Sequence, residues 1–523
     1  MTISSWAPLR EPVFRSLWLA VLAGNMGTWM HTVGAQWLVV REPDAATWVS
    51  LVQAATTLPV LVFALPSGAL ADNLDRRRLL LGVQLGLSCV AATLAALAAL
   101  DLVRPPLLLI FTFLLGAGQA LTLPSWQAVI PEIVPRERLP AASALGAVNT
   151  NLARSAGPAV GGLLVAQFGP AVVFALNAVS FAVFALALAF WRRPRQPPPA
   201  RPERFGTAVH DGGHFVRYSP DVRRILGRVL LFVLPGSVVW SLLPLVARDR
   251  GLGAGGYGGL LAALGAGAVL GALLMPRVRA RLTANRMALA TGLAYGAALA
   301  VIALVADVTA VAVALAAAGL AWMMLVSRMN AAMQLVLPNW VRARALAVYQ
   351  VVFAGAQAVG ALIWGQVAAA FGLTATFGTA AAMMVAGTLT VRALPVRTQE
   401  DTDTSPAVFW PEPHLMLQPH LDHGPVLVQA SYRVAEPNTS AFVAAMHELR
   451  DSRLRTGASR WGLFRDGADP QMFVETYLVP TWEEHLRQHE GRLTGSDEQA
   501  ERQAAALAEG PPVIRHLLDA ESL

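Results

Sequence analysis

Two arginines stand inside long apolar stretches of this sequence, where a charged side chain is out of place. Arg154 lies about fifteen residues into the stretch 139–167, and Arg328 lies ten residues before Pro338, in the stretch 309–334. If these stretches cross a bilayer, an unpaired charge at mid-depth costs at least about 2.5–3.5 kcal/mol. No Asp or Glu stands in the middle of any apolar stretch. Arg154 should therefore face an aqueous pathway, balanced by a substrate anion, a cluster of carbonyls or a carboxylate.

The other reactive side chains indicate neither catalysis nor a metal centre. Cys89 is the single cysteine, so disulfides and cysteine-based metal sites are excluded. His31 lies in the first apolar stretch and could relay protons, although packing is the simpler interpretation. His485 and His489 are four residues apart on a predicted helix, a spacing that suits a metal ion, but no third ligand is apparent. We expect no catalytic residue, no resident metal and no cofactor.

Composition places the elements that position these residues in lipid. The 523 residues are 55% hydrophobic and 14% charged, with a mean hydropathy of +0.50, whereas soluble domains are about 25% charged. A bilayer core about 30 Å thick requires about 20 apolar residues per helix. This predicts an all-α polytopic membrane protein with twelve spans, at 14–40, 46–71, 79–100, 106–129, 139–167, 170–191, 224–247, 255–276, 287–306, 309–334, 342–371 and 373–394.

The net charge of +7 comes from short arginine clusters between the spans. Such clusters are typical of cytoplasmic loops and argue against nucleic-acid binding. Alternate loops hold most of these arginines, at 76–78, 136–138, 192–204, 277–286, 342–344 and 392–397, and the intervening loops hold only Arg41, Arg104, Arg248 and Arg250. The positive-inside rule therefore predicts a multi-pass protein with both termini in the cytoplasm.

The spans divide into two related halves. Segment 192–223 is rich in proline and arginine, which predicts a cytoplasmic linker between halves 1–191 and 224–397. Segments 134–169 and 337–372 align without gaps and match Pro135 with Pro338, Gly157 with Gly360, Gly162 with Gly365, and Phe168-Gly169 with Phe371-Gly372. Each copy covers the fifth span of its half, which predicts two six-helix halves related by an axis along the membrane normal.

The loop between the second and third spans carries a candidate conformational switch formed by Gly68, Asp72, Arg76 and Arg77. Glycine lets helices approach closely. A carboxylate at a helix end can pair with arginines or a helix N-terminus in one conformation and release them in another. A positively charged loop with a chance aspartate is the alternative. The motif is similar to the Gly-x-x-x-Asp-x-x-x-Arg-Arg signature of major facilitator transporters, with Asp75 where the family often has glycine.

The fifth span carries a second motif, composed of Gly157, Pro158, Gly161 and Gly162. Small residues and a proline permit close packing and a local bend, and a purely structural helix of this composition is the alternative. Preceded by Arg154, the motif is similar to the antiporter motif that major facilitator transporters associate with export.

Several stretches resemble one branch of that family, the transmembrane secretion effectors, which include the enterobactin exporter group. They are 27–32, Gln36-Trp37, Ala71-Asp72 and 151–162, and the resemblance covers about residues 8–395. It implies an exporter of small amphipathic molecules, siderophore-like or drug-like, in a bacterial inner membrane. Transport would proceed by alternating access and be coupled to an ion gradient, with the proton as the expected ion.

The resemblance also implies that the first, fourth, seventh and tenth spans line a central cavity. Polar and aromatic side chains recur along these spans, most of them at helical spacing. They are Asn25, Trp29, Thr32 and Gln36; Gln119 and Trp126; Ser237 and Trp240; and Ser327, Asn330 and Gln334. Such stripes suit an amphipathic, aromatic cargo, because stacking needs no fixed charge. Bonding from helix to helix is the alternative for any one of the Ser, Gln and Asn residues.

The chain changes character after Arg397. Residues 398–425 are polar and proline-rich, which predicts a linker, and 426–523 predict a soluble α+β domain. Strands are expected at 426–434, 459–466, 471–478 and 512–518, and helices at 438–455, 481–489 and 496–508. The order β-α-β-β-α-β is ferredoxin-like.

The length of this tail and its helix at 482–489 resemble the dimeric α+β barrel domains of antibiotic-biosynthesis monooxygenase type. The resemblance implies a homodimer through the tail, as a dimerising or ligand-sensing module. The alternative is a membrane-anchored enzyme or sensor in which the tail acts on or senses the ligand. On the first strand, Val426, Val428, Ala430 and Tyr432 should pack on the helices. The other face, formed by Leu427, Gln429, Ser431 and Arg433, would meet a second copy.

Overall fold

The computed structural model describes the chain apart from residues 1–5, 192–204, 392–394, 396–402, 408–416 and 521–523 and the single positions 74, 339, 404, 406 and 418. The side chains of residues 64–73 and 205–211 and of positions 136, 343 and 490 also lie outside the described part. The chain forms two compact units. The first comprises Met1–Pro202, Gly227–Met329 and Gln350–Pro395, and the second comprises Glu203–Leu226, Asn330–Tyr349 and Val396–Leu523.

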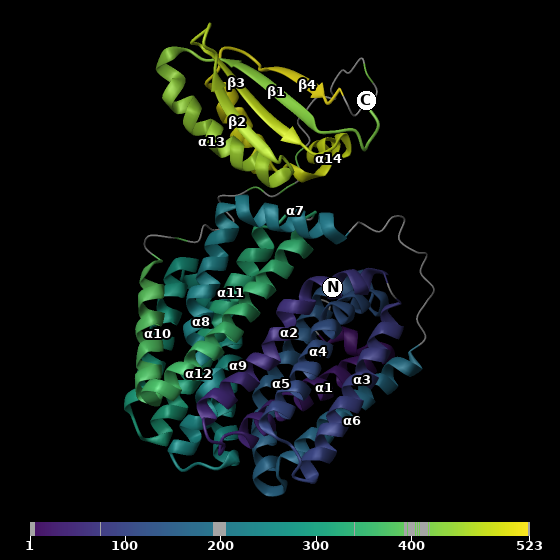
Figure 1. Ribbon diagram of the computed structural model, residues 1–523, viewed down its shortest axis with the longest axis vertical. Helices are drawn as coiled ribbons and strands as arrows, with labels where there is room; N and C mark the ends of the chain where they lie inside the picture. Colours follow the sequence, from purple (N-terminus) through teal and green to yellow (C-terminus); the bar gives the residue numbers. More distant parts are fainter. Residues whose placement is uncertain are drawn as a thin grey trace. The chain divides into compact units, whose positions relative to one another are not determined.

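Long helices build the first unit, and α8, α11 and α12 among them also extend into the second unit (Figure 1). They are α1 (Pro12–Leu38), α2 (Ala45–Asn73), α3 (Arg76–Ala99), α4 (Pro105–Ile133), α5 (Leu139–Phe168), α6 (Pro170–Phe190), α8 (Pro220–Asp249), α9 (Ala254–Arg281), α10 (Ala284–Leu304), α11 (Val308–Val336) and α12 (Arg342–Leu389). Helices α1, α4, α6 and α8 begin with proline, whose missing N–H costs no hydrogen bond at that position. The helix ends lie within a few residues of the predicted spans.

By length and composition, nine helices in the described part of the chain can cross a membrane. Helices α1 and α5 have 27 and 30 residues but carry more polar side chains along their length. The protein is therefore a mostly helical, multi-pass membrane protein.

Two glycines end the repeated segments with the same backbone conformation. Gly169 separates α5 from α6 with φ 79° and ψ 172°, and Gly372 breaks α12 with φ 78° and ψ 170°. Side chains are essentially excluded from this region of φ/ψ space, so both positions require glycine. The two aligned segments thus end in the same backbone conformation, and Gly372 lies between the two spans expected within α12.

The helices form two groups, α1–α6 in purple and blue and the later helices in teal and green (Figure 1). Consecutive helices joined by short loops run antiparallel. Helices α1, α3 and α5 therefore begin at one face of the bundle, called here the N-terminal face, and end at the opposite face. Near the N-terminal face Leu17, Leu80, Trp126 and Phe184 form a buried core among α1, α3, α4 and α6.

The predicted linker contains a helix that its composition did not indicate. Helix α7 (Phe205–Tyr218) belongs to the second unit. Proline and arginine dominate the first part of segment 192–223. Residues 205–218 instead carry Phe205, Val209 and Val216, whose spacing is compatible with one face of an amphipathic helix.

The tail forms a four-stranded antiparallel sheet in the order β2-β3-β1-β4. Its elements are β1 (Val426–Arg433), α13 (Thr439–Thr456), β2 (Arg460–Arg465), β3 (Met472–Val479), α14 (Trp482–Arg487), α15 (Gly495–Ala506) and β4 (Val513–Leu518). Every strand and helix lies where the sequence predicted it, to within a few residues.

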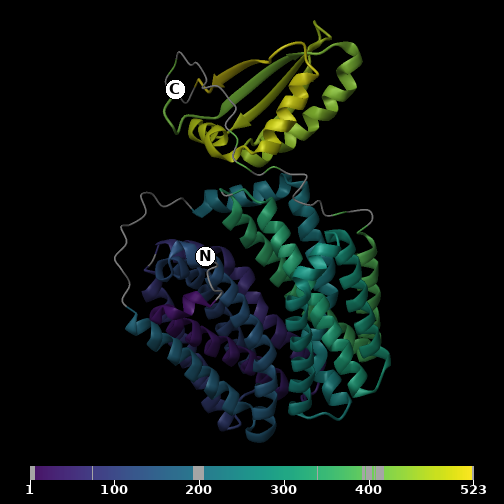
Figure 2. The ribbon, with the colours of Figure 1, turned by 180° about the vertical axis from the view of Figure 1, so that it is seen from behind.

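The two faces of this sheet differ as predicted. Val426, Val428, Ala430 and Tyr432 are buried, and Ala430 and Tyr432 belong to a core with side chains of α13 and α15. On the other face Arg433 and Phe464 are exposed, and Leu427, Gln429 and Ser431 are half-buried. Within the described residues, α13 and α15 cover the first face only (Figure 2).

Candidate functional site

A cavity of about 670 Å³ lies in the part of the bundle nearest the N-terminal face. Its walls come from the first half of α1, the last part of α4, the first half of α5, and side chains of α3 and α6. Three residues predicted for the cavity line it: Asn25, Gln119 and Trp126. All the residues that line it belong to the first six helices.

The polar side chains of this cavity also tie its helices together. Asn25 Nδ2 donates to Asn149 Oδ1 at 2.9 Å, and Asn149 Nδ2 donates to the carbonyl of Trp18 at 2.9 Å, which joins α1 to α5. Gln119 Nε2 donates to Thr28 Oγ1 at 3.3 Å and joins α4 to α1. The same residues therefore line the cavity and bond one helix to another.

The prediction from the sequence missed the contribution of α5 to this cavity. Ser143, Gly146, Asn149 and Thr150 line it from that helix. They recur at helical spacing, mostly three and four residues apart, so the same periodicity that identified the α1 stripe could have found them.

Arg154 lies one turn beyond Thr150, on the side of the cavity away from the N-terminal face. Its Cζ is 5.9 Å from the centre of the Trp29 ring, a cation–π contact. Trp29 in turn packs on Trp240, with ring centres 5.7 Å apart, and Trp240 packs on Trp322, with ring centres 5.9 Å apart. A charge predicted to face the pathway thus lies beside a row of tryptophans that crosses from α1 to α8 and α11.

A narrow cleft lies beside this row, lined by Arg154, Pro158, Trp240 and Trp322 and by apolar or small residues of α9 and α11. Its free volume of about 10 Å³ is close to the minimum for one water molecule. Arg154 Nε and Trp240 Nε1 are both buried without an acceptor among the described residues. Two of the residues that line the cleft therefore carry an N–H donor without an acceptor, and none of the lining side chains offers an acceptor.

Another membrane arginine shows how this fold satisfies a buried guanidinium. Arg228 of α8 donates to the carbonyl of Gly387 at 3.1 Å and to Thr390 Oγ1 at 2.9 Å. Arg154 has no such bond in the described structure, so part of the cost of burying its charge is not offset by the protein.

The bundle is tightly closed between the cleft and the opposite face. Gln36 is buried: its Nε2 donates to Gln53 Oε1 at 3.3 Å and to the carbonyl of Trp240 at 3.1 Å, and its Oε1 accepts from the Tyr257 hydroxyl. Predicted as a cavity residue, Gln36 instead joins α1 to α8 and α9 in this conformation.

The glycines of the export motif make the same closure possible. A Cβ at Gly157 would lie 2.7 Å from Trp29 Cβ, and one at Gly161 would lie 2.9 Å from Met30 Cα. A Cβ at Gly162 would lie 2.6 Å from Gly258 Cα of α9. Only glycine permits these approaches, so α5 packs directly on α1 and across the two halves on α9.

The second half repeats this packing. A Cβ at Gly360, the counterpart of Gly157, would collide with Ser237 Oγ of α8. A Cβ at Gly365, the counterpart of Gly162, would collide with Ser50 Oγ of α2. The two aligned segments therefore make comparable contacts: α5 packs on α1 and α9, and α12 packs on α8 and α2.

A family model described as transmembrane secretion effector matches residues 3–523 of this sequence. The chain belongs to the transmembrane secretion effector family. The match includes the tail, whereas the resemblance carried by the motifs ended near residue 395.

Known relatives of this transmembrane secretion effector are efflux proteins. The multidrug efflux pump Tap of Mycolicibacterium fortuitum is 30% identical over 383 residues, 70% of this chain and 92% of the pump. The enterobactin exporter EntS of Shigella boydii is 30% identical over 271 residues, 50% of this chain and 63% of the exporter. The chain is therefore an efflux transporter of the major facilitator superfamily.

Solved transporters share its fold. A bacterial homologue of the human lysosomal transporter Spinster, in an inward-facing and unoccupied conformation, has a TM-score of 0.56 at 16% identity, over 74% of this chain and 95% of that one. A point mutant of the nucleoside transporter NupG has a TM-score of 0.60 at 13% identity, over 73% of this chain and all of that one.

The arginines of the family's loop motif bind helix ends within the first half. Arg76 Nη1 lies 2.8 Å from Glu132 Oε1 at the end of α4. Arg77 donates to the carbonyls of Leu188 and Ala189 at 2.8 and 2.6 Å, where the C-terminus of α6 carries partial negative charge. The surroundings of Gly68 and the side chain of Asp72 lie outside the described part of the structure.

Asp75, the departure from the family pattern, caps α3. Its Oδ1 accepts from the backbone N–H of Arg78 at 2.9 Å. The motif is thus built to hold three helix ends together at the N-terminal face, and Glu132 is a member that the sequence alone did not reveal.

The remaining predicted cavity residues bond within their own helices. Thr32 donates to the Thr28 carbonyl, Ser237 to the Leu234 carbonyl, Ser327 to the Met323 sulfur, and Gln334 to Asn330 Oδ1. Ser237 is buried against Gly360 and does not line the cavity in this conformation. His31 is also buried and packs on Phe174, with ring centres 4.9 Å apart.

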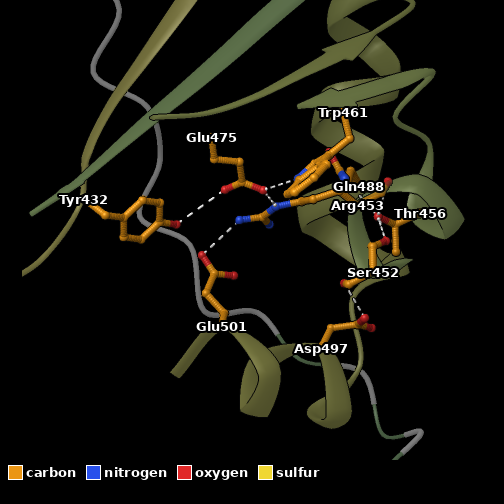
Figure 3. Close-up of polar contacts among 9 residues, drawn as sticks. All are labelled: Tyr432, Ser452, Arg453, Thr456, Trp461, Glu475, Gln488, Asp497 and Glu501. Carbon is orange, nitrogen blue, oxygen red and sulfur yellow. Dashed lines mark hydrogen bonds and ion pairs between the residues drawn. The ribbon is translucent and has the colours of Figure 1, made fainter. Parts of the chain in front are cut away.

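The interior of the tail holds a charged network around Arg453 (Figure 3). Arg453 is fully buried, with Nε 3.4 Å from Glu475 Oε1 and Nη2 3.2 Å from Glu501 Oε1. Glu475 also accepts from Trp461 Nε1 at 2.9 Å and from the Tyr432 hydroxyl at 3.4 Å. Each carboxylate is already engaged by an arginine, which favours a structural role over acid–base catalysis.

Three histidines meet beside this network. The ring of His485 lies 4.6 Å from that of His489 and 4.9 Å from that of His516 on β4, centre to centre. Among the described residues no group of three potential ligands has a geometry that could hold a metal. Burial, with smaller effects of His516 and Arg453, lowers the pKa of His485 to about 3. Burial, with smaller effects of His485, Arg453 and His516, lowers the pKa of His489 to about 2.

Proposed function

We propose that this transporter exports small amphipathic molecules across a bacterial inner membrane by alternating access. The observation that supports the proposal is a large cavity near one face of the bundle, next to a closed packing of α1, α5, α8 and α9 toward the other face. Alternating access requires this combination of one accessible side and one closed side.

We further propose twelve spans, in halves 1–191 and 224–397, with linkers at 192–223 and 398–425 and both termini in the cytoplasm. The distribution of arginines among the loops supports this orientation. The N-terminal face is then cytoplasmic, and the structure corresponds to an inward-facing state ready to load cargo.

In the proposed cycle the two halves rock about the row of tryptophans. The contact of Gly162 with Gly258 opens on the outward side, and the loop motif with Asp72, Arg76 and Arg77 rearranges on the cytoplasmic side. Uphill export requires an ion gradient, and we assign the proton as the coupling ion.

The cargo is proposed to be siderophore-like or drug-like. The cavity offers aromatic rings and neutral amides, from Trp126, Asn25 and Gln119, which suit an amphipathic molecule. The other side chains predicted for the pathway, Trp29, Trp240, Ser327 and Asn330, are proposed to meet the cargo later in the cycle.

For the tail we propose a ferredoxin-like domain at 426–523 that forms a homodimer through its uncovered face. Exposed Phe464 and half-buried Leu427 and Leu478 on that face would be covered by a second copy. Sedimentation of the purified tail tests this: a stable monomer at tens of micromolar contradicts it. Oxidation of candidate cargo by the purified full chain would instead support a catalytic tail.

Transport in energised inverted vesicles tests the main proposal. Vesicles with the transporter should accumulate dyes, drugs or siderophores when respiration acidifies their interior, and a protonophore should abolish the uptake. The control is Trp126→Ala, which removes an aromatic wall of the cavity and should weaken uptake of aromatic cargo. Uptake no faster than in vesicles without the transporter, over the whole panel, contradicts export.

A further inference from the structure

The cleft beside Trp29 has a chemical bias that neutral packing does not explain. Arg154 and Trp240 both line it, and neither Arg154 Nε nor Trp240 Nε1 has an acceptor among the described residues. The other lining side chains are apolar, and none offers an oxygen. Such a cleft is complementary to an acceptor, and its guanidinium favours one that carries negative charge.

The chain itself provides no anion at this depth. The carboxylates of the membrane helices are Asp72, Glu132, Asp221 and Asp249, and all four lie in the first or last turns of their helices. Arg154 is the sixteenth residue of the 30-residue helix α5. Half the length of α5 therefore lies between Arg154 and the helix ends, where the carboxylates of the membrane helices occur.

The internal repeat indicates that this charge is not needed for the fold. Residue 154 aligns with Gln357, three residues before Gly360, just as Arg154 stands three residues before Gly157. The two repeats pack in the same way around these glycines. A neutral amide thus serves at the equivalent position, and the arginine adds charge to one half only.

The position of the cleft connects it to the cargo route. Thr150 lines the large cavity, and Arg154, one turn further along α5, lines the cleft. On the far side Gln36 and Tyr257 close the bundle. A molecule that moves from the cavity toward the opposite face therefore passes Arg154 before the closure opens.

We propose that the cargo is an aromatic molecule with an acidic group, such as a carboxylate. Its ring system lies in the cavity, and its acidic group binds the Arg154 guanidinium and the Trp240 indole N–H when the cleft widens from its free volume of about 10 Å³. This rests on the proposed export function and specifies its substrate class. A cationic molecule would be repelled by Arg154, and a neutral one would leave the guanidinium without its counter-charge.

Binding to the purified full-length transporter in nanodiscs tests the charge preference without any transport step. Tritiated 1-naphthoate is the probe, and its isosteres 1-naphthamide and 1-naphthylmethylamine are the competitors. We expect 1-naphthoate to bind at least about tenfold more tightly than the amide, because a charge-assisted hydrogen bond is stronger than a neutral one. The amine should bind most weakly.

Three variants locate the preference. Arg154→Gln introduces the side chain found at the equivalent position of the repeat, Gln357, and should reduce the affinity for 1-naphthoate to that for 1-naphthamide. Arg154→Lys keeps the charge and should retain part of the preference. Arg328→Gln removes a membrane arginine that lines neither the cavity nor the cleft, and it should leave the preference unchanged.

The outcomes separate this inference from the function on which it rests. Equal wild-type affinities for the three ligands overturn it, and they are the result expected if an inorganic anion already occupies Arg154. An equal loss of 1-naphthoate affinity in Arg328→Gln and Arg154→Gln also overturns it. Export of neutral or cationic dyes by vesicles whose protein shows no carboxylate preference overturns the inference alone. A carboxylate preference in protein that exports nothing overturns the transport proposal and leaves the anion site standing.

Discussion

The contact between Gly162 and Gly258 gives a direct test of how the bundle closes on the side away from the N-terminal face. A Cβ at Gly258 would lie 2.8 Å from Gly162 Cα and 2.8 Å from the Pro158 carbonyl oxygen. Both neighbours are backbone atoms, which cannot rotate away. Gly258→Ala therefore forces α9 and α5 apart.

The geometry sets the size of the effect. Ordinary contacts of a Cβ begin at 3.4 Å, so the two helices must separate by at least about 0.6 Å. Overpacking of this kind costs about 1–3 kcal/mol. The cost falls on the state in which α5 and α9 touch, so the ratio of the open to the closed state of this contact should rise roughly 5- to 150-fold.

A buried cysteine can report this shift. Ala254 is 4% exposed at the start of α9, and its carbonyl faces Gly162. In a Cys89→Ser background, Ala254→Cys should react slowly with a thiol reagent, and adding Gly258→Ala should accelerate the reaction roughly tenfold.

The neighbouring glycine provides the matched control. A methyl group added at Gly259 would have no atom within 4 Å, so Gly259→Ala adds the same group to the same helix in open space. It should leave the labelling rate unchanged. Equal rates in the Gly258→Ala and parent proteins would refute the conclusion that this glycine contact closes the bundle on the side away from the N-terminal face.

Three further outcomes are expected. Asp72→Asn should abolish or strongly slow transport without loss of membrane insertion, because it removes the charge of the loop motif; wild-type kinetics in well-expressed protein would contradict this role. Glu132→Gln should slow transport less than Asp72→Asn, since Arg76 keeps its bond to the Ala128 carbonyl at 3.3 Å, and Glu132→Ala with the same rate as wild type would show that the pair is dispensable. The isolated tail should lose stability below pH 6.5, because the folded-state pKa values of His485 and His489, about 3 and about 2, lie below the unfolded value, so that the unfolded state binds more protons as the pH falls. Denaturant titrations should show that the free energy of unfolding falls by up to about 3 kcal/mol per pH unit from the two groups. A free energy of unfolding that does not change between pH 6.5 and 4 would refute the burial of these histidines as neutral rings.

Much of the fold could be predicted because its signals are local. Span length, arginine clusters and turn glycines are properties of short segments, and they located the helices and the breaks at Gly169 and Gly372. Period-two and helical patterns located each element of the tail. Burial of Val426, Val428, Ala430 and Tyr432 followed from simple alternation along β1.

Contacts between distant segments could not be predicted in the same way. Gln36 belongs to the stripe on α1, yet it bonds to Tyr257 some two hundred residues away and closes the bundle rather than lining the cavity. Glu132 gave no signal because its partner, Arg76, is known only from the packing of α3 on α4. Periodicity shows which residues share a face of a helix, and only tertiary structure shows what that face meets.

In the proposed cycle, the repeat separates the contacts that move the transporter from the residue that selects its cargo. Gly157 and Gly162 pack α5 on α1 and α9, and Gly360 and Gly365 pack α12 on α8 and α2. Equivalent contacts on both sides are what a rocking motion needs, since the same surfaces must form and break in turn. Charge does not follow this symmetry, because Arg154 is matched by Gln357 in the repeat. A residue that differs between the two repeats is not needed for this motion and can contact the cargo instead. Arg154, in the aromatic cleft, is such a residue.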